Sequence, residues 1–489
     1  MAKDMHSHLR QMAERFPEQV VTVSEIVDSN LEATALLQRL ENENRFPTVI
    51  FRNVKCPGSG KVSEFPLVFN MFARRSYLAV ALDMAPEKFR EELTLEGLRR
   101  AGNRIAPVVV AREEAPVKQV VKTGPEVDLF DLPIAVHHPR DVKPFILGGA
   151  VVQKDPELNT YNVALTRIQL NEPRQTGIKV EVVHHNGAIH AKNEEQGRPT
   201  PAAVVIGHHP AFYLGGQWEG HGSINGLDEY EIIGGMLDEP LRLVPSETFG
   251  HNLLVPADAE IIIEGNILPG VRQAEGPIAE HTRYYKNILG KEIVPHEAPV
   301  FEVTAMTCRT EAFYLDTFIG HPDEQMLCAI PKEAKIRQAV LLPAPGVKAV
   351  HLPPSGCGRY IGYMSIRANV EGAVRNAILA AFGCDPHLKY VIAVDEDIDV
   401  FQEDQVLWAL ALRTIPSNDC FVIPGARSIW LDPMTPMDGR RPVSAKMGID
   451  ATKPFGKPFS ATAYFSPDLV ERMDPAKYLD AKADLKKIL

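Results

Sequence analysis

The chain has 489 residues, of which 45% are hydrophobic and 24% are charged, a balance typical of globular proteins. Its 52 basic and 63 acidic residues give a net charge of −11, which disfavours nucleic acid or an anionic membrane as the main partner. This length predicts two or three domains. No apolar run approaches the roughly 18 residues needed to span a bilayer, and the first residues lack the apolar segment of a signal peptide. Six scattered cysteines without a CxxC pair fit a reducing compartment, so a cytoplasmic protein is expected.

The first 106 residues mix helix and strand patterns. Residues 29–32, Ser-Asn-Leu-Glu, have the form of a capping box and open a run with leucines at 36, 37 and 40 on one helix face. A short buried strand is predicted at 48–51 and a helix at 87–100. We therefore expect a small α/β domain over 1–106.

Strand patterns dominate the sequence after about residue 107. Turn residues separate predicted strands at 161–170, 178–185, 202–206, 260–264 and 300–307, with few helical stretches between them. This pattern predicts a β-barrel or sandwich domain over 107–320.

Strand and helix patterns alternate again in the last third of the chain, which predicts a second α/β domain over 321–465. The expected strands are 346–352, 360–366 and 390–394, and the expected helices are 372–382 and 404–412. The tail, 466–489, has the pattern of a polar helix that would pack on a neighbouring subunit. The predicted fold class is α+β.

Two carboxylates and a guanidinium carry the clearest chemical signal. Glu275 and Glu280 flank Gly276-Pro277, a turn former that can swing both side chains toward one partner. With Arg167, they supply the groups needed to keep one carboxyl protonated beside an ionised one. The alternative is that both glutamates are surface acids that pair with nearby cations.

Asn162 and Arg167 lie five residues apart in the predicted strand 161–170, so in a regular strand they would point to opposite faces. Both can serve one ligand only if the strand bends or ends between them. The alternative reading is two surface polar residues.

A mixed oxygen and nitrogen set suggests a metal. Adjacent histidines at 184 and 185 face opposite ways on a strand, so at most one of them can share a ligand with Asn162. Together with Glu229, that histidine and Asn162 would suit Mn²⁺ or Mg²⁺ better than structural zinc, because the set lacks a thiolate.

The ordered series of motifs resembles the UbiD-like family of reversible decarboxylases that use prenylated FMN. Its markers are Asn162-x-x-x-x-Arg167, His185-Asn186-Gly187, Asp228-Glu229-Tyr230, Val255-Pro256-Ala257-x-Ala259-Glu260-Ile261, Glu275-Gly276-Pro277 with Glu280, Leu352-Pro353-Pro354-x-Gly356-Cys357, and Ser444-x-Lys446-Met447-Gly448-Ile449-Asp450-Ala451-Thr452. The resemblance implies a central split β-barrel that binds the flavin, and a homodimer or higher homo-oligomer. It also implies a flavin prenyltransferase as cofactor supplier and a small carboxylic acid as substrate.

The resemblance assigns roles residue by residue. Asn162, His185 and Glu229 resemble the ligands of a manganese ion that bridges to the cofactor phosphate, with Glu231 as an alternative to Glu229 and a potassium ion nearby. The further residues that resemble cofactor contacts are Leu165, Thr166, Arg167, Asn186, Gly187 and Lys446.

The same resemblance implies a decarboxylation of an aromatic, heteroaromatic or α,β-unsaturated acid. In it, Arg167 orients the leaving carboxylate, Glu280 donates the proton that replaces CO₂, and Glu275 holds Arg167. One departure is Arg283, where relatives often have glycine; with His296 it is hypothesised to recognise a second anionic group, as on a furan-type dicarboxylate. The alternative for Arg283 is a solvent-facing loop residue.

Two rival functions remain at this point. A metal-dependent hydrolase or lyase would use the Asn162, His185 and Glu229 ion to activate water and would need no flavin. A non-catalytic flavin-binding subunit would keep cofactor binding after loss of Glu280.

Overall fold

The computed structural model describes residues 2–181, 184–218, 227–286, 288–289, 292–294, 296–435, 442–463 and 465–478. Within it the chain forms two compact units, Met1–Thr452 and Lys453–Leu489, which are described separately. In the described part of the chain, no helix is both long and apolar enough to cross a membrane.

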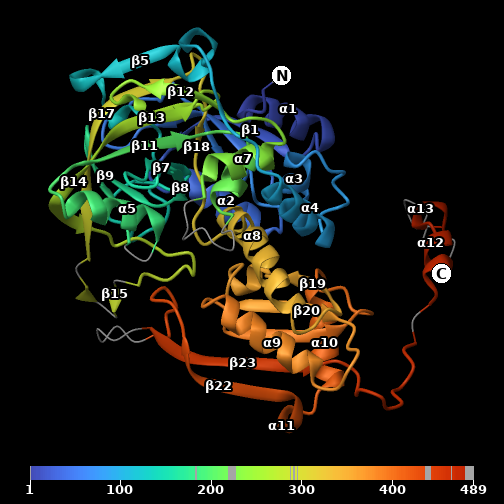
Figure 1. The fold of residues 1–489 in the computed structure, drawn as a ribbon. Helices are drawn as coiled ribbons and strands as arrows, with labels where there is room; N and C mark the ends of the chain where they lie inside the picture. Colours follow the sequence, from blue (N-terminus) through green and yellow to red (C-terminus); the bar gives the residue numbers. More distant parts are fainter. Residues whose placement is uncertain are drawn as a thin grey trace. The chain divides into compact units, whose positions relative to one another are not determined.

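The first unit begins with a four-stranded mixed sheet in the order β1-β2-β3-β18. Its last strand comes from far along the chain, so the N-terminal sheet is completed by a segment that follows the central sheet (Figure 1). The strands are β1 (Val20–Asp28), β2 (Thr48–Lys55), β3 (Leu67–Phe69) and β18 (Tyr314–Leu315). The accompanying helices are α1 (Met5–Arg15), α2 (Glu32–Asn42), α3 (Arg75–Ala81) and α4 (Glu91–Gly102).

Helix α2 exists as predicted, but the predicted capping box is wrong. Leu31 is the N-cap, in a left-handed conformation with φ 74°, and it makes no side-chain capping hydrogen bond. The hydroxyl of Ser29 is buried without a hydrogen-bond partner among the described residues. Glu32 instead accepts from the backbone N–H of Asp28 at 2.8 Å, so it fastens the strand end that precedes the helix.

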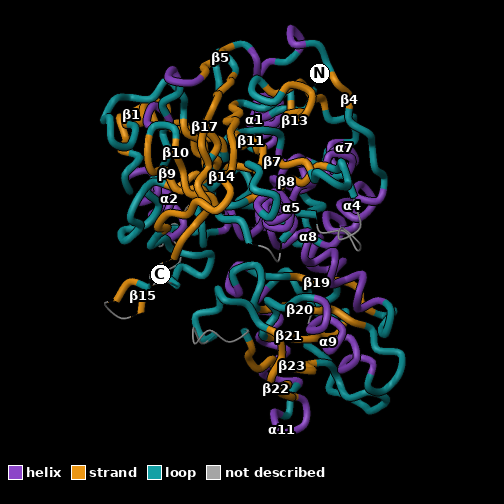
Figure 2. The backbone as a smooth tube through the Cα atoms, turned by 60° about the vertical axis from the view of Figure 1, so that its left-hand side comes forward, coloured by secondary structure: helices purple, strands orange, loops and turns teal. Residues whose placement is uncertain are grey.

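A nine-stranded antiparallel sheet forms the centre, in the order β6-β9-β10-β17-β14-β11-β7-β8, with β5 beside β17 (Figure 2). Its longest members, β14 and β17, pair over most of their length. The strands of this sheet are β5 (Val120–Thr123), β6 (Phe145–Ile146), β7 (Gly149–Lys154), β8 (Tyr161–Leu165), β9 (Ile168–Glu172), β10 (Gln175–Ile178), β11 (Thr200–Ile206), β14 (Ile261–Glu275) and β17 (His296–Cys308). Smaller sheets join β4 (Val108–Val109), β12 (Arg242–Ser246) and β13 (Gly250–Pro256), and separately β15 (Ile288–Leu289) and β16 (Glu292–Ile293).

Two expectations for this region are wrong. The described residues of the predicted strand 178–185 do not form one strand, because β10 ends at Ile178 and His185 begins a helix. The region also holds three helices: α5 (His185–Glu194), α6 (Pro210–Gly216) and α7 (Glu229–Leu237). Glycine explains the close packing of the last two: a Cβ on Gly215 would come within 2.8 Å of the Cα of Ile233.

The last part of this unit is a five-stranded mixed sheet in the order β19-β20-β21-β23-β22. Its strands are β19 (Val347–His351), β20 (Ile361–Ile366), β21 (Tyr390–Asp395), β22 (Cys420–Arg427) and β23 (Val443–Ala451). Its helices are α9 (Ala373–Cys384), α10 (Glu403–Arg413) and α11 (Pro416–Asp419). The unpredicted α8 (Pro322–Leu341) lies between the central sheet and this one, and both its faces carry buried side chains (Figure 1).

The second unit contains two short helices, α12 (Pro467–Arg472) and α13 (Pro475–Tyr478), where one polar helix over 466–489 was predicted. Proline at 475 cannot donate the hydrogen bond that would continue α12. Residues 479–489 of that prediction lie outside the described residues.

Candidate active site

Arg167 lies where one predicted strand becomes two. β8 ends at Leu165 and β9 starts at Ile168, so the strand is interrupted at Thr166 and Arg167. That break is the condition under which both side chains can face one ligand.

The guanidinium of Arg167 is held by two glutamates. Its Nε and Nη2 donate to Oε1 and Oε2 of Glu275 at 3.0 and 2.7 Å, and its Nη1 donates to Oε1 of Glu280 at 2.6 Å. Glu275 is the last residue of β14, and Glu280 follows it across a cis Gly276–Pro277 bond. All three side chains are at most 9% exposed, so the structure brings together the three residues to which the sequence assigned chemistry.

The charges in this triad stabilise one another. Burial alone would lower the pKa of Arg167, but attraction to Glu280 and Glu275 raises it well above its ordinary value. Burial alone would raise the pKa of Glu275, but attraction and hydrogen bonds from Arg167 outweigh it and hold that pKa below its usual range. Glu275 is therefore a permanent carboxylate at neutral pH.

Sequence reasoning missed the residue that fixes Glu275. The buried side chain of Gln169 accepts from the N–H of Gly276 at 2.7 Å and donates to the carbonyl of Ala274 at 3.1 Å, so it grips the backbone on both sides of Glu275. Its position two residues after Arg167, on the same face of an extended chain, was the available signal.

The loop after Glu280 is tied to the last sheet region. His281 Nε2 lies 3.0 Å from the hydroxyl of Tyr360, and the two rings stack. Lys286 donates to the carbonyls of Asp432 and Thr435, both at 2.9 Å. Burial lowers the pKa of His281 well below its ordinary value, so the ring is neutral at pH 7.

Glu229 and His185 begin two helices beside β8. Glu229 Oε2 accepts from the N–H of Val163 at 2.5 Å, and its Oε1 lies 3.7 Å from His185 Nδ1. Asn162, on the same strand as Val163, is buried, and its amide Nδ2 has no hydrogen-bond partner among the described residues. Glu229 is thus the glutamate that reaches both β8 and His185, which favours it over Glu231 as the candidate ligand.

These groups fit a hard cation. Burial raises the pKa of Glu229, and a bound cation would offset that cost by favouring the carboxylate. The Nδ2 position of Asn162, which has no partner among the described residues, would supply an oxygen with the side-chain amide in its other orientation. Among the described residues no three His, Cys, Asp or Glu side chains form a metal cluster, so a zinc-type set is not seen there.

Three family models match the chain in order. They describe the N-terminal, Rift-related and C-terminal domains of 3-octaprenyl-4-hydroxybenzoate carboxy-lyase, at residues 13–95, 108–322 and 325–451. The chain belongs to the UbiD family.

Solved and curated relatives agree with this. The UbiD-class enzyme HmfF from Pelotomaculum thermopropionicum, in complex with FMN, is 34% identical, with a TM-score of 0.86 over 97% of this chain and 100% of that one. An evolved dimeric form of HmfF in complex with prFMN is 32% identical, with a TM-score of 0.83 over 98% of this chain and 100% of that one. The anhydromevalonate phosphate decarboxylase of Methanothermobacter thermautotrophicus is 29% identical over 452 residues, 91% of this chain and 97% of that protein.

This UbiD-family chain is therefore a UbiD-like carboxy-lyase. The recognised family is the one that the motifs indicated. The chain has three UbiD domains of mixed helix and strand content.

Four of the remaining candidate cofactor contacts lie close in sequence to Arg167 or His185, and the fifth, Lys446, does not. Leu165 and Thr166 precede Arg167, and Asn186 and Gly187 are in the first turn of α5. Lys446 is elsewhere: it is buried in β23 and donates to the carbonyls of Asp385 and Pro386 at 3.1 and 3.3 Å. Burial lowers its pKa to about 8.

The two candidate substrate residues also differ in position. His296 faces Glu275 across the β14–β17 pair, with Nε2 3.3 Å from Glu275 Oε2. Arg283 donates to Glu41 at 2.6 Å and to the carbonyl of Gly320 at 2.5 Å. These contacts engage Nε and Nη2 of Arg283, which leaves its Nη1 for a substrate.

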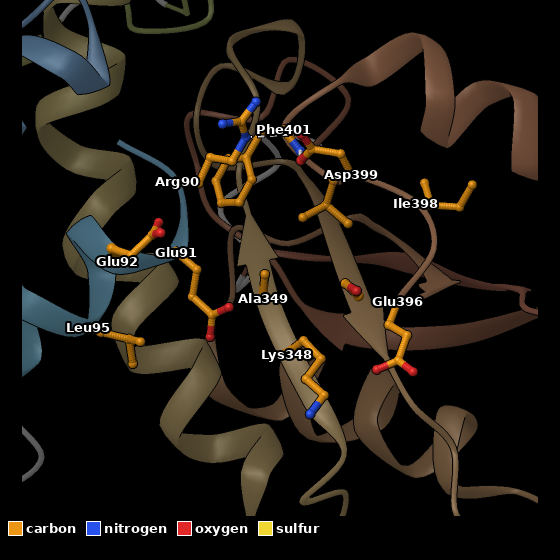
Figure 3. A pocket seen from close by; sticks show the side chains of 12 residues that line it. Arg90, Glu91, Glu92, Leu95, Lys348, Ala349, Glu396, Ile398, Asp399 and Phe401 are labelled. Carbon is orange, nitrogen blue, oxygen red and sulfur yellow. Dashed lines mark hydrogen bonds and ion pairs between the residues drawn. The ribbon is translucent and has the colours of Figure 1, made fainter. Parts of the chain in front are cut away.

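A pocket of about 370 Å³ opens beside the start of α4 (Figure 3). Arg90 and Asp399 meet at its rim in an ion pair of 3.0 Å, and Phe401 lies beside them. None of the candidate site residues lines this pocket, so it is separate from the Arg167 triad.

Proposed function

We propose that this chain catalyses the reversible, non-oxidative decarboxylation of an aromatic, heteroaromatic or α,β-unsaturated carboxylic acid, with Arg167, Glu275 and Glu280 as its acid–base machinery. The observation that carries the proposal is the buried triad, in which one guanidinium bridges two carboxylates. Burying three charged groups is costly, and their meeting at the three positions that the motifs assign to chemistry supports a catalytic role.

Arg167 has donors to spare for a substrate. A guanidinium carries five N–H bonds, and the two glutamates take three of them. The remaining N–H bonds on Nη1 and Nη2 point from a planar fork that suits a carboxylate. Arg167 thus binds and orients the group that leaves as CO₂.

Glu280 is the proposed proton donor. Only its Oε1 contacts Arg167, which leaves Oε2 for a proton. Glu275 is held ionised by Arg167 and therefore has no proton to give, which leaves Glu280 as the donor of the pair. In the decarboxylation direction Glu280 gives its proton to the carbon that lost CO₂; in the carboxylation direction it removes a proton from that carbon.

We propose that prenylated FMN, with Mn²⁺ and K⁺, completes this site, supported by the FMN and prFMN complexes of HmfF. Asn162, His185 and Glu229 would hold the manganese ion, and Leu165, Thr166, Asn186 and Gly187 would contact the cofactor. When bound, the modified flavin supplies an electrophilic centre that takes up the charge left by CO₂ loss. A flavin prenyltransferase is the expected supplier of the cofactor.

The test is co-expression with a flavin prenyltransferase, followed by measurement of CO₂ release from a panel of aromatic and heteroaromatic acids. We expect release by the wild type and its loss in Glu280→Gln, with Glu297→Gln as control because Glu297 is exposed on β17. Activity in flavin-free protein would favour the metal-dependent hydrolase instead. Cofactor binding without CO₂ release from any acid, in the wild type and in Glu280→Gln alike, would favour a binding subunit, and full activity in Glu280→Gln would show that Glu280 is not the proton donor.

A second candidate substrate class is a furan-type dicarboxylate, for which Arg283 and His296 would bind the second carboxylate. Arg283→Ala should then lower turnover of a dicarboxylate and spare a monocarboxylate. Equal turnover of both would remove this candidate.

The dimeric form of HmfF supports a homo-oligomeric state for this chain. Light scattering of the purified protein would give the number of subunits. A monomeric mass at micromolar concentration would contradict it.

A further inference from the structure

The loop that carries Glu280, residues 277–285, is hydrogen-bonded to a short segment that precedes β6. That segment, residues 138–142, is called the clamp segment below. Three consecutive clamp residues each contact the loop. Arg140 N–H donates to the hydroxyl of Tyr285 at 2.9 Å, Asp141 Oδ1 accepts from the N–H of Ala279 at 2.8 Å, and Val142 N–H donates to the carbonyl of Pro277 at 3.0 Å. The contacts thus begin before Glu280 in the loop and end after it.

The clamp segment is a turn that its own sequence favours. The N–H of Asp141 donates to the carbonyl of His138 at 3.0 Å, which closes a four-residue turn with Pro139 in the second position, where proline is preferred. Asp141 Oδ2 accepts from the N–H of His138 at 2.9 Å, so the side chain closes the turn as well. This side chain is fully buried. One oxygen of Asp141 therefore fixes the turn, and the other holds Ala279.

The clamp segment is anchored to the strand that begins beside Arg167. β6 starts shortly after it, and Ile146 of β6 pairs with Ile168, the first residue of β9 and the residue after Arg167. Apolar packing joins the same parts, because Ile278 of the Glu280 loop shares a small buried cluster with Phe145 of β6. The clamp segment therefore connects the backbone beside Arg167 with the backbone beside Glu280.

Tyr285 closes the far end of the loop. The guanidinium carbon of Arg140 lies 5.9 Å from the centre of its ring. Burial and the negative charge of Asp141 raise the pKa of Tyr285 to about 12, so its hydroxyl is neutral at pH 7 when it accepts from the Arg140 N–H. The N–H of Glu280 donates to the carbonyl of Tyr284 at 3.0 Å. The backbone of Glu280 is thus held on both sides.

We infer that Asp141 is a positioning residue for the proposed proton donor, because it holds the N–H of Ala279 and so fixes where the Glu280 carboxyl lies. Arg167 holds that carboxyl by one hydrogen bond of 2.6 Å to Oε1, which sets a distance but not the orientation of Oε2. Proton transfer requires Oε2 to lie about 2.6–3.2 Å from the reacting atom, so the backbone must supply the orientation. This inference rests on the proposed function.

The alternative is that Asp141 only stabilises the fold. An aspartate that accepts backbone N–H bonds stabilises a turn wherever it occurs. A purely structural role predicts a loss of stability, and a loss of activity that is the same whether or not Glu280 is present. A positioning role predicts that the effect of Asp141 on turnover disappears once Glu280 is replaced, because two residues that act as a unit are not additive.

The first test measures the clamp segment without any chemistry. Hydrogen–deuterium exchange of the cofactor-free protein is followed by mass spectrometry for peptides that cover residues 277–285. Asp141→Ala removes both acceptor oxygens, and Asp141→Asn keeps one oxygen and the side-chain volume. Asp128→Ala is the matched control, because Asp128 accepts from the N–H of Phe130 at 2.9 Å in another turn of the Rift-related domain. We expect exchange about tenfold faster in Asp141→Ala and unchanged in the control.

The second test measures CO₂ release by the cofactor-loaded enzyme. Asp141→Ala should lower kcat by about 10- to 100-fold and leave KM within about threefold, because Arg167 still binds the substrate and only the proton donor is displaced. Asp141→Asn should lower kcat by about three- to tenfold. In the Glu280→Gln background neither substitution should change kcat by more than about twofold, since no proton donor is left to position. Asp128→Ala should match its parent in both backgrounds.

The outcomes separate two failures. Unchanged exchange or unchanged kcat in the Asp141 variants, or the same fold loss with and without Glu280, would overturn the inference and leave the proposed function standing. If Asp141→Ala does not fold, Asp141→Asn decides between these outcomes. No CO₂ release from any acid by the cofactor-loaded wild type would overturn the proposed function, and the inference with it.

Discussion

Arg167 and Glu275 are joined by two parallel hydrogen bonds, although 108 residues separate them in the chain. The bidentate contact leaves Nη1 to reach Glu280, so the position of the proposed proton donor depends on the pair. Two Glu→Gln substitutions, which keep the side-chain shape, should separate these roles.

Glu280→Gln should lower kcat by about 10²–10⁴-fold, since it removes the proton donor, while substrate affinity stays close to that of the wild type. Glu275→Gln should lower kcat/KM by about 10- to 100-fold, because a charge-assisted contact with Arg167 becomes a neutral one. Steady-state CO₂ release by both variants would check this. A larger loss in Glu275→Gln than in Glu280→Gln would reverse the assignment.

Gln169 should act as a positioning residue. Gln169→Met keeps the side-chain volume but releases the backbone on both sides of Glu275. We expect a roughly tenfold fall in kcat with little change in KM, and a shifted acid limb in the pH profile of kcat/KM, because Glu275 loses its fixed distance to Arg167. Gln11→Met, at a half-buried glutamine on α1, is the control. An unshifted pH profile would mean that Gln169 only stabilises the fold.

Metal binding should depend on Glu229 and not on Glu231. Titration of the cofactor-free protein with Mn²⁺, followed by electron paramagnetic resonance, should show a bound ion that Glu229→Gln abolishes and Glu231→Gln retains. Since burial raises the pKa of Glu229, protons compete with the ion and affinity should rise with pH. Equal losses in the two variants would count against the assignment.

Folding stability should fall between pH 6.5 and about 3 because of a buried histidine in α1. His8 is 1% exposed with no hydrogen-bond partner for either ring nitrogen among the described residues, and burial lowers its pKa from 6.5 to about 3. The unfolded chain therefore takes up the proton first as pH falls through 6.5, and stability is lost over that window.

The expected size is about 2 kcal/mol at pH 5, from 1.5 pH intervals at 1.36 kcal/mol each. His8→Met should remove that part of the loss when urea unfolding at pH 7 and pH 5 is compared. His251→Gln, at an exposed histidine, should leave the pH dependence as in the wild type. If His8→Met lost as much stability as the wild type, the buried ring would not be the cause.

Local patterns predicted single elements better than their assembly. Strand patterns located β11, β20 and β21 to within about two residues, because alternation and turn residues act over a few positions. Helix α8 was missed, since it is buried on both faces and contains Pro331, so it lacks the one-sided pattern of a surface helix.

The site shows the same division. The break after Leu165 was a condition that could be stated from spacing alone, yet the meeting of Arg167 with Glu275 requires β9, β10, β17 and β14 to pair in that order. No local pattern encodes this strand pairing. The three residues could be grouped from the sequence only through the family motifs. The helix that starts at His185 was not predicted, because its start lacks a sequence signal. The N-cap residue is His184, not Ser, Thr, Asp or Asn, and its side chain makes no capping hydrogen bond.

Glu280 begins a loop that is hydrogen-bonded to the part of the chain that carries the last sheet. The two contacts are His281 to Tyr360 and Lys286 to Asp432. A shift of that sheet by about an ångström would therefore move the carboxyl group of Glu280 through these two hydrogen bonds. Turnover would then be sensitive to solvent viscosity, so that adding sucrose slows the enzyme even when the proton transfer itself is unaltered.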